Sequence, residues 1–448
     1  MTIATSDAPP PAPRTIADSG ERRVRLTLFV LFLVFTLNFV DRQIVNILAE
    51  PIKRDLHLSD TQLGLLTGLA FAAFYTVLGI PLARYADRRS TDRVTLISGS
   101  IAVWSAMTAV CGFAATYPQL LLARLGVGVG EAGCTPAAHS LIADLVPPQR
   151  RSSALALYGL GIPAGSLIGL ALGGVLADRF GWRTAFLVVG APGILMALLV
   201  WLTVPEPRRS AGMATGQRVQ EPLRTTLAWL IRSRLFVELT TAAVFVAFLG
   251  YGKAVWTAVF FIRVHHLTPG QTGLWLGLVA GIAGMAGTWL GGRLAVRGEL
   301  RGPFRALRAP AIGMAITAPF YIAAYAASDW RVAMAFIAIP NLLGALYYGP
   351  LFATVQTIVP PPMRAMAVAI IAFTQNLIGL GLGPLFFGML SDLLTGSLGP
   401  EGLRWVLIGS GFLGLIPAWL FWRAEKGLAA AAATTNGAAD GGLPQERT

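Results

Sequence analysis

The sequence contains few of the residues from which enzymes and metalloproteins build reactive centres. Among its 448 residues there are two cysteines and four histidines. Cys111 and Cys134 both lie within long apolar segments, so they indicate neither a disulfide framework nor a metal site. The histidines are scattered and form no pair at metal-ligand spacing. We therefore predict no bound metal and no cofactor. We also do not expect an enzyme, because the sequence shows no paired nucleophile and base.

Charged residues are also scarce, which argues against an ordinary soluble domain. Only 13% of the residues are charged and 55% are hydrophobic, whereas about a quarter of the residues in a typical globular domain are charged. Twelve apolar segments of about 20 residues are each long enough to cross a hydrocarbon core roughly 30 Å thick. They lie near residues 25–48, 61–83, 94–116, 119–143, 152–177, 184–204, 235–262, 271–292, 308–327, 331–356, 364–390 and 403–423. The composition predicts an all-α membrane protein with twelve transmembrane helices.

The net charge of +13 is distributed in a way that is typical of membrane proteins. If the N-terminus is cytoplasmic, most of the 35 lysines and arginines fall in cytoplasmic segments, which is the positive-inside pattern. This pattern predicts that both termini are cytoplasmic, and it accounts for the basic charge without a nucleic-acid partner. No small-residue cleavage site follows a short apolar core before the first span, so we expect no signal peptide. We expect a multi-pass protein of the plasma (inner) membrane, surrounded by the lipid bilayer.

The two halves of the chain share one series of motifs. HLSDTQLG at 57–64 matches HLTPGQTG at 266–273, and each contains a Ser or Thr followed three residues later by Gln. This spacing is the capping box that begins a helix, so we expect helices 2 and 8 to begin here, just beyond the external surface. A second match pairs VPPQRRSSALAL at 146–157 with VPPPMRAMAVAI at 359–370. After a small insertion, Gly165, Gly169 and Asp178 align with Gly379, Gly383 and Asp392.

The repeat predicts two related lobes. A site between two similar lobes can open to either side of the membrane when the lobes rock, which indicates a transporter. We divide the chain into a disordered cytoplasmic N-terminal tail (1–20), an N-terminal six-helix lobe (21–204), a cytoplasmic linker (205–234), a C-terminal six-helix lobe (235–426) and a disordered cytoplasmic C-terminal tail (427–448). In helix 5, four glycines four residues apart form a ridge that permits close helix packing: Gly161, Gly165, Gly169 and Gly173.

The loop after the second span resembles the signature of the major facilitator superfamily. It reads ARYADRRSTDR at 83–93, and the core of the signature is the Asp-Arg pair Asp87 and Arg88. The resemblance implies a cytoplasmic latch through this pair, which forms when the protein opens outward. The corresponding segment of the second half, GRLAVRGEL at 292–300, has Val296 in place of the acid. We therefore expect the latch to be one-sided.

Helices 1 and 4 resemble those of the Spinster-like branch of the superfamily. The matching segments are LNFVDRQIVNIL at 37–48 and RLGVGVGEAGCTPAAHSLIADLVPP at 124–148, with support from GPLFATVQTIVPP at 349–361. The resemblance implies the major facilitator fold, with twelve helices in two pseudo-symmetric six-helix lobes. It also implies transport of lysolipids or sphingolipid-like amphiphiles, often coupled to protons.

Five ionisable residues lie well inside the predicted spans: Asp41, Arg42, Arg124, Glu131 and Lys253. A charge that faces lipid costs about 2.5–3.5 kcal/mol on insertion scales, so these residues should face a cavity or pair with one another. Arg124 and Glu131 are two helical turns apart and share one face. We predict Glu131 as the main proton-carrying acid and Asp41 as the second, with Arg42 and Arg124 as their charge partners. The alternative is a static ion-pair cluster that holds helices 1 and 4 together.

Further residues are candidates for a cavity or a gate. Lys253 lies in helix 7, near the repeat equivalent of the helix 1 pair. It either meets Glu131 or Asp41 across the cleft as a gate, binds an anionic headgroup, or extends to the outer interface with its stem in lipid. The other candidates are Tyr158, Asn341, Tyr348, Gln375 and Asn376.

The sequence thus predicts a secondary active transporter that works by alternating access. We expect a monomer that couples protons to the movement of a small amphiphilic or lysolipid-like substrate. Within transport, the alternative is a drug or organic-anion exporter of the same superfamily. Outside transport, it is a membrane receptor that has kept the fold and lost turnover.

Overall fold

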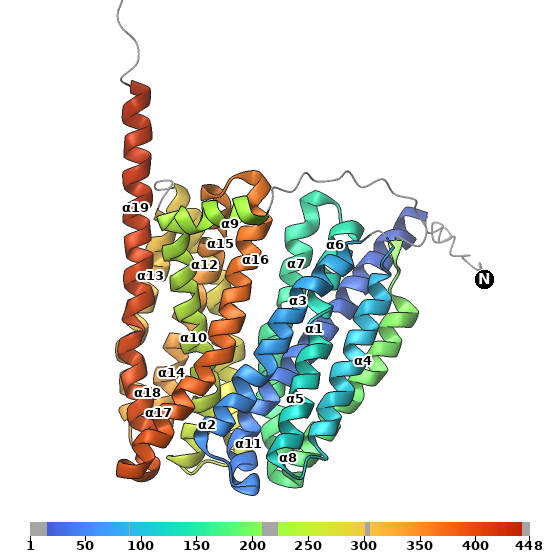
Figure 1. The fold of residues 1–448 in the computed structure, drawn as a ribbon, viewed down its shortest axis with the longest axis vertical. Coiled ribbons are helices and arrows are strands. Elements are labelled where there is room, and N and C mark those ends of the chain that lie inside the picture. The colour runs from blue at the N-terminus through green and yellow to red at the C-terminus, as the bar shows by residue number, and fades with distance from the viewer. Residues whose placement is uncertain (1–15, 89, 208–222, 301–304, 441–448) are drawn as a thin grey trace, which may run out of the picture.

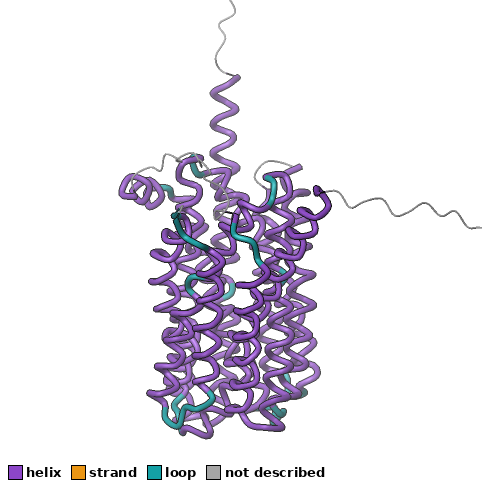
Figure 2. Tube along the Cα trace, turned by 90° about the vertical axis from the view of Figure 1, so that its right-hand side faces the viewer, coloured by secondary structure: helices purple, strands orange, loops and turns teal. Residues whose placement is uncertain are grey.

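All regular structure in the described part of the chain is helical. The computed structural model describes residues 16–88, 90–207, 223–300 and 305–440, and no strand occurs within them (Figure 2). The predicted all-α fold is therefore confirmed. The N-terminal tail up to residue 15, linker residues 208–222 and the last eight residues lie outside the described ranges.

The N-terminal lobe contains six crossings. Several of them are built from more than one helical segment, and a π-helical turn interrupts the second. The segments are α1 (Ile16–Leu56), α2 (Asp60–Gly64), the π-helix η1 (Leu65–Leu69), α3 (Ala70–Asp87), α4 (Arg93–Cys111), α5 (Tyr117–Glu131), α6 (Cys134–Leu145), η2 (Pro148–Arg150), α7 (Arg151–Gly159) and α8 (Gly161–Thr203). Gly181 has a φ of 80° inside α8, a conformation that favours glycine. The chain kinks there, so α8 supplies parts of both the fifth and the sixth crossing.

The C-terminal lobe repeats this plan. Its segments are α10 (Arg234–Arg263), α11 (Pro269–Leu278), the π-helix η4 (Val279–Ala283), α12 (Gly284–Leu300), η5 (Arg305–Leu307), α13 (Arg308–Ala326), α14 (Trp330–Gly344), η6 (Ala345–Tyr347), α15 (Tyr348–Ile358), η7 (Pro361–Met363), α16 (Arg364–Thr374), the π-helix η8 (Gln375–Leu382), α17 (Gly383–Leu398), η9 (Gly399–Glu401), α18 (Gly402–Leu413) and α19 (Leu415–Asp440).

The described residues contain the twelve predicted crossings. Nine helical stretches are long and apolar enough to cross a membrane by length and composition. Two of them, 148–203 and 361–429, each hold two crossings, because the helical backbone continues through the turn between them. A further crossing, 117–145, is interrupted at Ala132 and Gly133.

The ends of the lobes differ from the predicted boundaries. The predicted linker contains a short helix, α9 (Leu223–Arg232), in which Leu230 is buried and Ile231 is 70% exposed. The last helix continues to Asp440, so the disordered tail expected from residue 427 is wrong over 427–440. The segment is rich in alanine, which has the highest helix propensity. At the other end, α1 begins at Ile16 rather than at residue 21.

The two lobes lie side by side (Figure 1). They contact each other where α8 packs against α11, where α2 packs against α17, and along α1 and α10. The α2 and α11 ends of the bundle lie opposite the end that carries α9 (Figure 1). The positive-inside pattern predicts that the α9 end is cytoplasmic and the α2 and α11 end is external.

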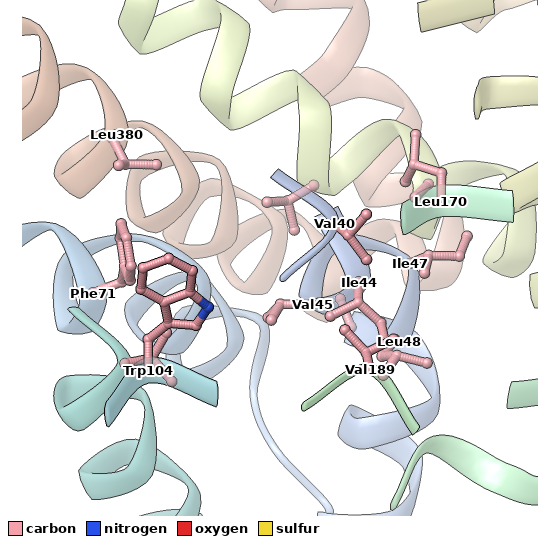
Figure 3. Close-up of a cluster of buried hydrophobic side chains, with 14 of the residues drawn as sticks. Val40, Ile44, Val45, Ile47, Leu48, Phe71, Trp104, Leu170, Val189 and Leu380 are labelled. Atoms are coloured by element: carbon pink, nitrogen blue, oxygen red, sulfur yellow. The ribbon is translucent and has the colours of Figure 1, made fainter. Parts of the chain in front are cut away.

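The core of the N-terminal lobe forms around α1. Val40 and Ile44 of α1 belong with Phe71 and Trp104 to one buried cluster that also includes Leu380 of the other lobe (Figure 3). The predicted glycine ridge packs α8 against α1, because a Cβ atom on Gly169 would lie only 2.9 Å from the Cα atom of Val40. The expected close packing of this ridge is confirmed.

Candidate functional site

A buried ion pair links α1 to α5. Arg42 donates from Nε to Oε2 of Glu131 at 2.8 Å, and the Glu131 side chain is fully buried. The guanidinium group of Arg42 also lies 4.9 Å from the ring centroid of Phe71 and 4.5 Å from that of Tyr75. Cation–π contacts of this kind stabilise a desolvated positive charge. Phe39 adds a third ring at 5.4 Å, so Arg42 lies between one carboxylate and three aromatic rings.

Asp41 points toward a different helix. Successive residues on an α-helix are separated by about 100° around its axis, and Asp41 accepts a hydrogen bond from Thr108 of α4, with Oγ1 2.7 Å from Oδ1 and 2.8 Å from Oδ2. Both side chains are buried. Arg42, Arg124 and Glu131 all act electrostatically on Asp41. The neighbours Asp41 and Arg42 thus point in different directions from α1.

Arg124 does not pair with Glu131. It is buried against Phe71, at 5.4 Å from the ring centroid, and its Nε and Nη1 atoms have no hydrogen-bond partner among the described residues. Residues seven apart on a helix share a face but are separated by about 10 Å along the axis. Of the two predicted charge partners, Arg42 of α1 is the one that reaches Glu131. One carboxylate oxygen of Glu131, Oε1, also lacks a described partner.

Lys253 is buried within the C-terminal lobe. Its Nζ atom lies 3.6 Å from the ring centroid of Tyr321 on α13, and the residue is only 5% exposed. No ion pair of Lys253 occurs among the described residues. The structure therefore contradicts both the lysine that extends to the outer interface and, in this conformation, the gate with Glu131 or Asp41. The ring of Tyr321, rather than a carboxylate, lies against the ammonium group of Lys253. Sequence spacing does not indicate this contact.

Two of the remaining candidates have local packing roles. Tyr158 is 2% exposed and stacks on Phe35 with ring centroids 4.2 Å apart, and it also contacts His139 edge to face. Asn341 donates to the carbonyl oxygen of Ile337 in its own helix at 3.0 Å. The contacts of Tyr158 stay within the N-terminal lobe and that of Asn341 within the C-terminal lobe, and none of these contacts involves the Arg42–Glu131 pair.

The other three candidates lie together in the C-terminal lobe. Gln375 donates to the carbonyl oxygen of Ala243 at 3.2 Å and to the hydroxyl group of Tyr347 at 3.4 Å. Its neighbour Asn376 is half-buried. Tyr348 is 52% exposed, so it keeps an accessible aromatic face in this conformation.

The predicted latch residues lie at the α9 end of the bundle. Asp87 is the last residue of α3 and Arg88 follows it in an extended conformation, and both are exposed. The guanidinium group of Arg88 lies 5.9 Å from the ring centroid of Tyr85. No inter-lobe ion pair of Asp87 occurs among the described residues, so the latch remains a prediction for the outward-open state.

Sequence reasoning missed an ion cluster where α2 meets α17. Arg263, the last residue of α10, donates to both carboxylate oxygens of Asp60 at 2.7 and 2.8 Å and to Glu50 at 2.8 Å. Ser391 donates to Asp60 at 2.5 Å, and Lys53 also bonds to it. Asp60 is fully buried. Lys53, Asp60 and Arg263 lie at or near helix ends, where charged residues are ordinary.

Both predicted capping boxes are confirmed. Ser59 accepts from the backbone of Gln62 at 3.0 Å and its own backbone donates to that side chain at 2.9 Å. Thr268 and Gln271 form the same pair of bonds, each at 3.2 Å. Helices 2 and 8 therefore begin where the sequence predicted.

Two aspartates reach these helix starts from the opposite lobe. Asp392 of α17 accepts from the backbone nitrogens of Asp60 at 2.9 Å and Thr61 at 2.7 Å. Asp178 of α8 accepts from the backbone nitrogen of Gly270 at 2.9 Å. These inter-lobe bonds lie at the same end as the Asp60 cluster, so the lobes are joined by polar contacts at the end away from α9.

The family of the chain follows from comparison with known proteins. The model of the Major Facilitator Superfamily matches residues 31–380. The chain belongs to this superfamily, in its Spinster-like branch. It is 37% identical to an MFS-type efflux pump of Mycolicibacterium smegmatis, over 91% of this chain and 94% of the pump. It is 30% identical to protein spinster homolog 1 of Mus musculus, over 86% of this chain and 76% of that protein.

A solved structure of this branch has the same fold. It is a bacterial homolog to the human lysosomal transporter Spinster, in an inward-facing and unoccupied conformation. The TM-score is 0.81 at 33% identity, and the match covers 90% of this chain and 97% of that one. The protein is therefore a Spinster-like superfamily transporter and an integral multi-pass membrane protein, and its family and fold are those of transporters rather than enzymes.

Proposed function

We propose that this transporter is proton-coupled and that it moves an amphiphilic, lysolipid-like substrate by alternating access. The observation that carries the coupling is the buried pair of Arg42 and Glu131 beside Asp41. The Spinster-like resemblance of helices 1 and 4 supports the substrate class. We further propose a monomer of the plasma (inner) membrane with both termini in the cytoplasm.

Protonation of Glu131 would free Arg42 to bind a second anionic group. Arginine does not lose its proton in proteins, so Glu131 is the member of the pair that gains or loses the proton. Its unpaired Oε1 atom is available to receive that proton. A protonated Glu131 leaves the charge of Arg42 without this carboxylate, facing the rings of Phe39, Phe71 and Tyr75. The freed charge then attracts an anionic group of the substrate or the second carboxylate, Asp41.

Asp41 is the second acid of the proposal. Its only described hydrogen bonds come from Thr108, so no guanidinium group fixes its charge directly. Arg124 is near enough to act on it electrostatically. A proton on either carboxylate changes the charge balance of the same four residues, which lets protonation and substrate binding influence each other.

The arrangement of the lobes supports an inward-facing state. The inter-lobe polar contacts of Asp60, Asp178 and Asp392 lie at the end that we predict to be external. The similar bacterial Spinster homolog is inward-facing. In this state Tyr348 and Asn376 offer an aromatic face and an amide to an amphiphile that enters from the cytoplasmic side.

A drug or organic-anion exporter is the second candidate. It is favoured by the similarity to the efflux pump of Mycolicibacterium smegmatis. The same Arg42 and Glu131 pair would couple either cargo to protons. Competition for transport between a lysolipid and an organic anion without an acyl chain separates the two candidates.

The coupling is tested in proteoliposomes with an imposed pH gradient. Glu131→Gln should bind substrate and permit downhill exchange but lose proton-driven accumulation. The matched control is Glu206→Gln, which removes a buried carboxylate from an Arg93 ion pair elsewhere in the same lobe. The control should lower stability and keep the response to the pH gradient.

Two outcomes contradict the proposed role of Glu131. If accumulation by Glu131→Gln still follows the pH gradient, the role passes to Asp41, which Asp41→Asn then tests. If both variants lose only thermal stability, like the control, the cluster is a static link between helices. The topology is checked separately, with reporter enzymes fused to each terminus.

A further inference from the structure

The outer contact between the lobes contains the same arrangement twice: an aspartate of one lobe bonds to the start of a helix in the other. Asp178 and Asp392 occupy equivalent positions in the sequence repeat. Each accepts hydrogen bonds from the first backbone N–H groups of a helix in the other lobe, α11 and α2 respectively. Such N–H groups have no partner within their own helix and carry a partial positive charge, so a carboxylate stabilises them.

The backbone around each aspartate follows the same symmetry. One turn before the aspartates stand Gly174 and Gly388. A Cβ atom on Gly174 would overlap the carbonyl oxygen of Pro269, and one on Gly388 would overlap that of Asp60. Both aspartates thus reach the opposite helix only because a glycine in their own helix lets the two backbones meet.

The two copies are nevertheless unequal, and the difference lies in one pair of equivalent residues. Asp60 in the first capping box corresponds to Pro269 in the second. Proline has no backbone N–H, so Asp178 bonds to Gly270 alone whereas Asp392 bonds to two successive N–H groups. Asp178 is also exposed, whereas Asp392 is half-buried.

The side chain of Asp60 adds an inter-lobe ion pair that the proline cannot form. Its carboxylate is buried and bound in a fork by Arg263 of the other lobe. Bidentate arginine–carboxylate pairs are among the strongest polar contacts in proteins. The repeat equivalent of Arg263 is Arg54, which among the described residues pairs only with Glu50 of its own helix.

We propose that Asp178 and Asp392 are the paired locks of the external gate: their bonds hold the outer ends of the two lobes together. The α2–α17 side, reinforced by Asp60 and Arg263, sets the balance between the inward-open and outward-open states. The inference rests on the alternating-access part of the proposed function and is independent of protons and substrate. Opening the outer side requires all of these bonds to break. Losing them therefore raises the outward-open population.

The test measures the distance between two spin labels in the absence of substrate and of any pH gradient. Cysteines replace the exposed Thr116 and Ser397, one in each lobe at the outer end, in a chain whose buried Cys111 and Cys134 are changed to alanine. Pulsed electron–electron double resonance then gives the ratio of long to short distances, which reports outward-open against inward-open molecules.

Three variants and one control are compared. Asp392→Asn should raise the outward-open ratio about tenfold, as expected for the loss of charge-assisted hydrogen bonds, and Asp178→Asn by roughly threefold or less, since its single bond is exposed. Asp60→Asn should produce the largest shift. Asp55→Asn is the control, because Asp55 pairs with Arg183 at the same end but within one lobe, and it should leave the ratio unchanged.

The outcomes separate the parts of the inference. Unchanged ratios in both Asp178→Asn and Asp392→Asn overturn the paired locks. A shift in Asp178→Asn that equals or exceeds that of Asp392→Asn overturns the unequal roles. A shift in the Asp55→Asn control assigns the effect to external charge in general and also overturns the proposal. Since no gradient is applied, loss of proton coupling in Glu131→Gln has no bearing on these results.

Discussion

Gly388→Ala should act as a wedge in the outer contact. The added methyl group would overlap the carbonyl oxygen of Asp60, which belongs to the backbone of α2 and cannot rotate away. Overpacking of this kind costs about 1–3 kcal/mol, and the cost falls only on the state in which α2 and α17 touch. The outward-open population should therefore rise by about 5- to 150-fold, since each 1.4 kcal/mol is a factor of ten.

The effect of alanine on helix stability must be separated from the wedge. Alanine in place of glycine stabilises a helix by about 0.5–1 kcal/mol, in the inward-open and the outward-open state alike. Gly409→Ala is the matched control, because Gly409 is exposed in α18 and a Cβ atom there meets nothing within 4 Å. The assay is the distance between labels at Thr116 and Ser397. Equal distance distributions in the two variants would refute the reasoning.

Three further predictions concern an ion pair, a helix cap and the latch. Arg93→Ala should lower the free energy of unfolding by about 3–5 kcal/mol, because it removes the buried guanidinium group that donates to the carboxylate of Glu206 at 2.6 Å. Thermal unfolding in detergent measures this, and a loss below about 1 kcal/mol counts against it. Ser59→Ala should cost about 1 kcal/mol by removal of the cap, with Thr268→Ala as its symmetric counterpart, and hydrogen exchange at the start of α2 should rise in the first variant only. Asp87→Asn should shift the inward–outward equilibrium in accessibility labelling, and an unchanged equilibrium would end the latch hypothesis.

Features that depend on a short stretch of chain were predictable from the sequence. The capping boxes at Ser59 and Thr268 involve residues three apart, so a tetrapeptide contains all of the information. The transmembrane helices follow from the requirement that backbone groups in lipid find partners within their own segment. The burial of Asp41, Arg124 and Glu131 follows from the cost of a charge that faces lipid.

Features that depend on the relative height of two helices were not predictable. Helical periodicity places Arg124 on the face of Glu131, but it carries no information on which residue of α1 lies level with that carboxylate. Of the two predicted charge partners, Arg42 forms the ion pair with Glu131 and Arg124 does not. Lys253 was expected to meet an acid, to bind an anionic headgroup or to extend to the outer interface, and in the structure its ammonium group lies against an aromatic ring of α13. A single sequence does not reveal such ring contacts, because aromatic residues are common throughout membrane helices.

The outer ion cluster was missed for a different reason. Asp60 and Arg263 are 203 residues apart, and each lies at a helix end where charged residues are ordinary. The repeat did contain a usable signal. The aligned octapeptides differ at Asp60 and Pro269, and the two halves of the chain share the equivalent aspartates that contact them.

The π-helical turn η1 fixes the directions in which the two ends of the second crossing point relative to each other. A π-turn accommodates one more residue than an α-turn of the same height, and η1 lies between Asp60 at one end of this crossing and Asp87 at the other. Each residue turns the helix by about 100°. Relaxation of η1 to α-helical geometry would therefore rotate one end against the other by that angle, so that Asp60 and Asp87 could not keep their present directions together. The extra residue works as a fixed angular offset between the two membrane faces of a single helix.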